Sequence, residues 1–167
     1  MFVHLHCHSH YSFLRGVASP EEIIAAAVEQ NMPTVALTDT NGLYAAVSFY
    51  KAAKDKGIKP IVGVVLDVEF RVSSIETRHS KHETRNSASA PLTLLAMDME
   101  GYSNLCQLVT LRHLGTTKLS QNMNSAGTDG RPVTLQELAE HNRGVIALCP
   151  VTSHQSQVTN HQPLFST

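Results

Sequence analysis

A capped helix followed by a short, continuous apolar run limits the folds that this chain can adopt. Ser19 and Glu22 form a capping box around a proline at the first helical position, which predicts a helix over residues 20–30. Residues 34–38 (TVALT) form an apolar run of strand length, typical of a parallel sheet that is buried on both faces. Residues 2–6 also have the pattern of a strand. These segments together predict a strand-helix-strand unit.

The same alternation continues toward the C-terminus. It predicts a helix over 43–56 that stops at Gly57, a strand over 58–70, a strand over 91–97, a helix over 102–115, a second capping box at Thr134 and Glu137, and a strand over 144–149. Five strands separated by helical segments favour an α/β fold with a largely parallel sheet. The residues expected in its core are Ile23, Ile24, Ala27, Val28, Val35 to Leu37, Leu43, Ala46, Val47, Tyr50, Ala53 and Ile146 to Leu148.

Two polar stretches interrupt this pattern. Residues 71–90 lack periodicity, which predicts an exposed, poorly ordered loop, and residues 151–167 form a tail of uncertain structure after a domain over 1–150. A closed barrel of eight strand-helix units takes about 250 residues. We therefore expect an open barrel with exposed apolar surface, and a fragment or a truncated gene product.

Composition excludes several classes of protein. Thirteen basic residues against fourteen acidic ones give no general surface for a polyanion. Three widely spaced cysteines fit a reducing compartment better than a disulfide framework, so we expect a cytoplasmic protein. No apolar run reaches the length of a membrane span, which argues against a membrane partner.

Histidines at alternate positions near the N-terminus are the first candidates for chemistry. His6 and His8 would share one face of a strand, so both imidazoles could reach one metal ion, whereas Cys7 would point into the core. Asp39 ends the run TVALT, at the sheet edge where ligands gather in parallel α/β folds. Each has a plainer explanation: many His-x-His pairs are surface residues, and Asp39 or its successors can cap the next helix.

Longer stretches of the sequence make the comparison specific. The segments HLHCHSHYSFLRG, MPTVALTDTNGLYAAVSFYKAAKDKGIKPIVG and LTLLAMDMEGYSNLCQLVTLRHL resemble the opening of bacterial DNA polymerase III alpha subunits, including the error-prone relatives. The resemblance runs from Phe2 to about Pro150. It implies a PHP domain, a partial and distorted parallel (β/α) barrel whose strand ends hold divalent metal ions such as zinc, manganese or magnesium.

The resemblance also shows where this chain departs from the family. The first family motif falls on His6 and His8, and Asp39 matches the acidic residue of the second. The histidine that should follow is Thr40, and an expected acidic residue is Val65. Asp67 lies one pleat repeat further on, about 7 Å away, so we do not expect it to substitute.

These departures imply a structural PHP domain with a degenerate metal site in a DNA replication polymerase. DNA, reached through the parent polymerase, and other replisome subunits are the implied partners. The alternative is an active metal-dependent phosphoesterase, in the family manner a 3′-to-5′ exonuclease; a separate small phosphatase ranks third. Tyr11 and Arg15 are weak candidates for phosphate contact. Polymerase activity itself needs a palm domain that does not fit in 167 residues.

Overall fold

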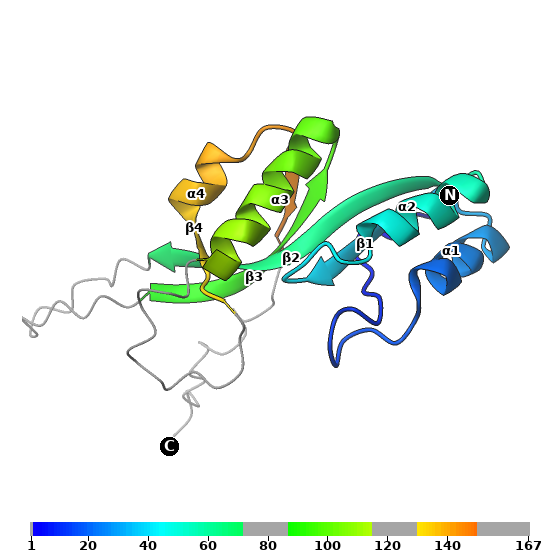
Figure 1. Cartoon of the computed structure of the whole chain (residues 1–167), viewed down its shortest axis with the longest axis horizontal. Helices are drawn as coiled ribbons and strands as arrows, with labels where there is room; N and C mark the ends of the chain where they lie inside the picture. Colours follow the sequence, from blue (N-terminus) through cyan, green and yellow to red (C-terminus); the bar gives the residue numbers. More distant parts are fainter. Residues whose placement is uncertain (1, 72–86, 115–129, 150–167) are drawn as a thin grey trace, which may run out of the picture.

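The computed structural model describes residues 2–71, 87–114 and 130–149 (Figure 1). In chain order the elements are α1 (Pro20–Glu29), β1 (Thr34–Thr40), α2 (Ala46–Asp55), β2 (Lys59–Arg71), β3 (Ser87–Ala96), α3 (Met99–Leu114), β4 (Val133–Thr134), α4 (Leu135–Glu140) and β5 (Val145–Leu148). Both capping boxes are confirmed, at the starts of α1 and α4. The chain thus has the mixed α/β character that its sequence predicts.

The sheet is mixed, so the prediction of a largely parallel sheet is wrong. Strand β1 pairs with β2 in parallel, and so does β4, whereas β3 runs antiparallel to β2 and β5 antiparallel to β3. The register of β2 and β3 extends from Gly63 opposite Leu95 to Arg71 opposite Ser87. Because the adjoining ends of the two strands are paired, the chain turns back there, and a reversal of this kind gives antiparallel strands.

The same pairing shortens the predicted polar loop. Arg71 still belongs to β2, and residues 87–90 already belong to β3, which begins four residues before the predicted strand at 91–97. The rest of the loop, residues 72–86, lies outside the described residues, as does the tail after Cys149.

The N-terminal segment is not the strand that was predicted over residues 2–6, although it runs beside β1. The carbonyl oxygens of His4 and Cys7 accept hydrogen bonds from the backbone N–H groups of Ala36 and Thr38, at 2.9 and 2.8 Å. The segment advances three residues while β1 advances two. That extra residue breaks the regular ladder in the manner of a bulge, so strand geometry does not continue.

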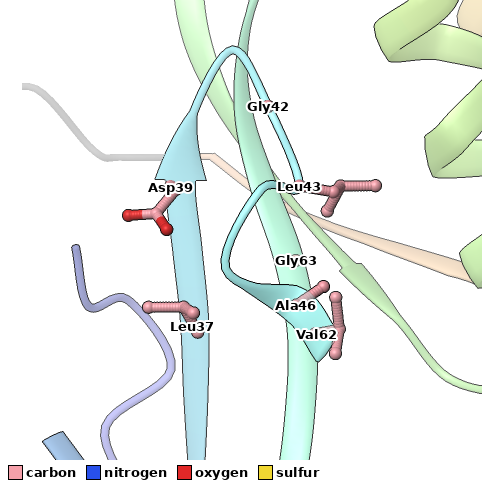
Figure 2. A pocket seen from close by; sticks show the side chains of 7 residues that line it. All are labelled: Leu37, Asp39, Gly42, Leu43, Ala46, Val62 and Gly63. Carbon is pink, nitrogen blue, oxygen red and sulfur yellow. The ribbon is translucent and has the colours of Figure 1, made fainter. Parts of the chain in front are cut away.

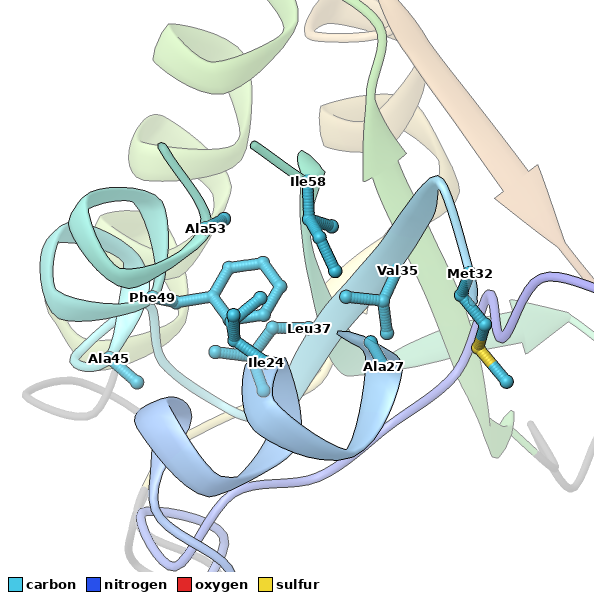
Figure 3. Packing of buried hydrophobic residues seen from close by; sticks show 9 residues of the cluster. All are labelled: Ile24, Ala27, Met32, Val35, Leu37, Ala45, Phe49, Ala53 and Ile58. Carbon is cyan, nitrogen blue, oxygen red and sulfur yellow. The ribbon is translucent and has the colours of Figure 1, made fainter. Parts of the chain in front are cut away.

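Long strand β2 joins two hydrophobic clusters on the helix-covered side of the sheet. The first lies between α1, α2 and β1 (Figure 3), and its buried members are Ile24, Ala27, Met32, Val35, Leu37, Ala45, Phe49, Ala53 and Ile58. The second lies beneath α3, and its buried members are Val64, Leu66, Val68, Leu92, Leu94, Leu105, Leu108 and Val133. Each cluster buries one side of a strand against helices, which is how a two-layer α/β unit stabilises itself.

Several residues that the sequence predicts in the core lie on the exposed side of their helices. Val28, Val47 and Tyr50 are 42, 61 and 52% exposed, whereas Phe49, which the pattern missed, is fully buried. Helix α2 turns Ala46, Phe49 and Ala53 inward, a stripe at i, i+3 and i+7. The predicted burial of Val35 to Leu37 is confirmed.

Strand β5 corrects the other core prediction. Ile146 is 44% exposed and Ala147 is exposed as well, because β5 lies at the end of the strand order and pairs with β3. The chain just before β5 approaches α3 closely at two glycines. A Cβ on Gly101 would lie 1.9 Å from the carbonyl oxygen of Gly144. Among the helices described here, none is long and apolar enough to cross a membrane.

Candidate functional site

A closed loop after the histidine segment organises the candidate site. Backbone hydrogen bonds from Ser12 to Ser9, from Gly16 to Ser12 and from His10 to Ala18 fold residues 9–18 back on themselves. Gly16 packs against the main chain, since a Cβ there would lie 2.1 Å from the carbonyl oxygen of Ser9. The loop therefore presents its side chains from a fixed backbone at the C-terminal end of β1.

Asp39 is the buried anchor of this loop. The backbone N–H of Ser9 and the hydroxyl of Ser12 both donate to Oδ1 of Asp39, and the Ser9 hydroxyl donates to Oδ2, each at 2.7 Å. Only 2% of Asp39 is exposed. A buried carboxylate needs such donors to offset its lost hydration, so its oxygens are already committed to holding the N-terminal segment.

The hydroxyl of Ser12 links Asp39 to His8. It donates its single hydrogen to Asp39, so it can only accept from the backbone N–H of Thr40, at 3.0 Å, and from Nδ1 of His8, at 3.2 Å. This assigns the hydrogen of a neutral His8 to Nδ1 and leaves Nε2 as the acceptor. Burial and the neighbouring His6 lower the pKa of His8, and Asp39 partly opposes this shift.

His6 lies over the face of the sheet opposite the helices. Its Nδ1 is 3.1 Å from the hydroxyl oxygen of Thr38 and 3.2 Å from that of Thr93. The structure brings the two histidines together: the ring centroids of His6 and His8 are 4.7 Å apart, nearly perpendicular.

The two departures from the family motifs lie on the same face as the His6 ring. Thr40 is opposite Val65 in the β1–β2 register, and Val65 is opposite Thr93 in the β2–β3 register, so the three side chains form one row across the sheet. Thr38 shares that face with Thr40 because residues two apart in a strand point the same way. The hydroxyl of Thr40 is buried without a hydrogen-bond partner.

Asp67 takes no part in this row. Its Oδ2 lies 3.4 Å from NH2 of Arg112, a residue of α3 that is completely buried. The same guanidinium donates from NH1 to the backbone oxygen of Arg131 at 3.0 Å. Desolvation lowers the pKa of Arg112, and the charge of Asp67 counteracts that shift. The expectation that Asp67 does not replace the missing ligand agrees with this ion pair.

We tested whether these residues fit a metal centre of the family type. Two imidazoles are adjacent, but Asp39 is occupied by three donors, Val65 has no ligand atom, and the Thr40 hydroxyl is a poor donor. Within the described ranges, no three His, Cys, Asp or Glu side chains are placed to hold one ion. A multimetal centre needs bridging carboxylates, so the present arrangement does not fit one.

The remaining candidates lie at the rim. Tyr11 and Arg15 are exposed on the closed loop, and the positive charge of Arg15 contributes to the lowered pKa of His8. A small pocket also borders Asp39, but its other lining residues, Leu37, Gly42, Leu43, Ala46, Val62 and Gly63, offer no polar side chain (Figure 2). In that view the carboxylate of Asp39 points toward the N-terminal segment and away from Leu43. Cys7 packs against the first hydrophobic cluster, as expected.

Sequence reasoning missed Ser9 and Ser12, the two residues that bond Asp39. Both are almost fully buried, at 0 and 1% exposure. Their spacing carries no signal that separates them from other serines of a polar loop. Only the contact with β1, some thirty residues away in the chain, reveals their role.

Comparison with known proteins identifies the family of this chain. The family model described as PHP domain matches residues 4–164. The DNA polymerase III subunit alpha of Chlamydia muridarum is 41% identical over 112 residues, 67% of this chain and 9% of that protein. The error-prone DNA polymerase of Anaeromyxobacter sp. is 35% identical over 149 residues, 89% of this chain and 12% of that protein. An amidohydrolase structure from Chromobacterium violaceum aligns at 24% identity with a TM-score of 0.47, covering 68% of this chain and 34% of that one.

The chain belongs to the PHP domain family. Relatives of about 40% identity include DNA polymerase III alpha subunits and an error-prone DNA polymerase. The chain spans about a tenth of the length of these relatives.

Proposed function

We propose that this chain is the PHP domain of a DNA polymerase III alpha subunit and acts mainly as a structural platform with a degenerate metal site. The observation that carries the proposal is the row Thr40–Val65 beside His6, where the resemblance implies an imidazole and a carboxylate. Val65 is 4% exposed and packs as an apolar residue. Without those two ligands, little negative charge is available to hold two or three cations against their mutual repulsion.

The use of Asp39 supports the same proposal. Its carboxylate holds Ser9 and Ser12 in place, and hence His8 and the closed loop. Oδ1 of Asp39 already accepts two hydrogen bonds and Oδ2 one, so about one acceptor position of the carboxylate is left for a metal ion. Weak binding of one divalent ion by His6 and His8 is the most that we propose for the site. Zinc, manganese and magnesium are the candidate ions that the family resemblance implies, and of these zinc suits a pair of imidazoles best.

We infer a partial, distorted barrel, cytoplasmic localisation, and contact with DNA and replisome subunits through the rest of a polymerase chain. The names of the relatives support that setting. The activity of the whole polymerase is not ascribed to this segment.

Hydrolysis of a single-stranded oligonucleotide tests the platform against the alternative, an active 3′-to-5′ exonuclease. With manganese or zinc, the purified chain should cleave no faster than the metal alone, and His8→Ala should change nothing. Cleavage well above that background, lost in His8→Ala but kept in His4→Ala, would establish the nuclease. His4 is the matched control because it is an exposed histidine of the same segment.

A further inference from the structure

Three aromatic rings, those of His10, Tyr11 and Tyr44, form a row on the rim of the site. The ring centroids of His10 and Tyr11 are 4.5 Å apart with an interplanar angle of 31°, and those of Tyr11 and Tyr44 are 6.5 Å apart at 27°. Tyr11 is 47% exposed and Tyr44 66%. Two tyrosine rings that are nearly parallel and largely open to solvent present flat surfaces for a further planar group.

Both tyrosines are held in position by the backbone. A Cβ on the buried Gly42 would lie 2.2 Å from Cε2 of Tyr44, so the Tyr44 ring packs directly on the main chain of the loop after β1. The backbone N–H of Tyr11 donates to the Ser9 hydroxyl at 3.2 Å, and that hydroxyl is bonded to Asp39. The rings are therefore preorganised, which lowers the entropy that binding must overcome.

The charge around the rings favours an anion. Residues 2–19, which carry Tyr11, contain four histidines and Arg15 but no Asp or Glu. Residues 40–50, which carry Tyr44, also lack acidic side chains. Asp39, between these segments in the fold, is buried and bonded to serine donors. Arg15 is exposed on the same closed loop as Tyr11.

We propose that Tyr11 and Tyr44 form a stacking platform for the bases of single-stranded DNA, with Arg15 contacting a phosphate. The choice of DNA rests on the proposed function; the platform itself needs neither a metal ion nor bond cleavage. Unpaired bases expose their faces to aromatic side chains, and such stacking tolerates any sequence. Double-stranded DNA hides those faces, so it is not the ligand that this geometry fits.

Fluorescence polarisation with a labelled oligothymidylate, in EDTA and at low salt, tests the proposal. Tyr11→Ala and Tyr44→Ala should each weaken binding roughly tenfold, within the range for loss of one stacked base. Tyr44→Phe should bind like the parent chain because the ring is kept. Arg15→Gln should weaken binding and reduce its salt dependence, as loss of a phosphate contact does.

The controls separate stacking from general attraction. Tyr50 is the matched control, an exposed tyrosine of α2 outside the row, and Tyr50→Ala should leave affinity unchanged. An abasic oligonucleotide of equal length should bind much more weakly and should not quench tyrosine fluorescence, whereas oligothymidylate should. Equal binding of the abasic strand, or no binding of either by the parent chain, would overturn the proposal. Because EDTA prevents metal-dependent cleavage, these results are independent of the hydrolysis assay.

Discussion

Thr40 and Val65 are direct partners in the parallel register of β1 and β2, so the two positions where the chain departs from the family motifs lie side by side. They also share a face with the hydroxyls of Thr38 and Thr93 that contact His6. The loss of both expected ligands therefore affects one patch of the sheet, next to the two remaining imidazoles.

The first prediction restores that patch. The double variant Thr40→His with Val65→Glu should bind manganese or zinc about ten- to a hundredfold more tightly than the parent chain, comparable to what a supporting group around a metal contributes. Isothermal titration calorimetry measures the change. Because Val65 is 4% exposed, the new glutamate should lower stability without metal, and metal should restore it.

The matched control for this variant is Thr40→His with Val65→Gln, which has nearly the same shape but no carboxylate. It should gain much less affinity. Equal affinity in the two variants would show that position 65 does not face the ion, and the assignment of the patch would be wrong.

The second prediction concerns the anchoring role of Asp39. Asp39→Asn should lower the free energy of unfolding by about 3 kcal/mol, because three hydrogen bonds to a buried carboxylate are weakened together. Urea denaturation measures this, and a double-mutant cycle with Ser12→Ala should show strong coupling. Asp55→Asn, at an exposed carboxylate, is the control. A change in Asp39→Asn as small as in this control would exclude the anchor.

The third prediction concerns acid pH. The hydrogen-bonded Arg131 guanidinium lowers the pKa of Glu137 to about 2. Burial acts against this shift, and hydrogen bonds from Thr134 add to it. Since the folded pKa lies below the unfolded one, this carboxylate contributes stability above its unfolded pKa of 4.5 and loses that contribution as the pH falls toward 2. The stability gap between the parent chain and Glu137→Gln should therefore close over this window. Glu29→Gln, an exposed carboxylate of α1, should show no comparable closing.

The fourth prediction concerns the buried Arg112. Asp67→Ala should destabilise the chain by about 1 to 3 kcal/mol, less than for a fully buried ion pair because Asp67 is 33% exposed. Replacing both partners, with Arg112→Met added, should recover part of that loss since no unpaired charge remains. Thermal unfolding monitored by circular dichroism compares the variants; an additive double variant would show that the two residues do not interact.

The local features of this protein could be read from short stretches of its sequence. Capping boxes at Ser19 and Thr134, and the buried run at Val35 to Leu37, depend on neighbouring residues and on hydrophobic periodicity, so they were predictable. The family motifs were likewise visible as letters, including the changes at Thr40 and Val65. These are properties of short segments, and short segments are what a sequence specifies directly.

The way in which those segments meet depends on contacts between distant parts of the chain. The reversed direction of β3 follows from its pairing with β2, and the inward turn of Phe49 follows from the packing of α2 on α1 and β1. Asp39 became an anchor because Ser9 and Ser12 approach it from a distant part of the chain. Long-range pairing and burial choose among alternatives that local propensity leaves equal in free energy, so a single sequence does not reveal the choice.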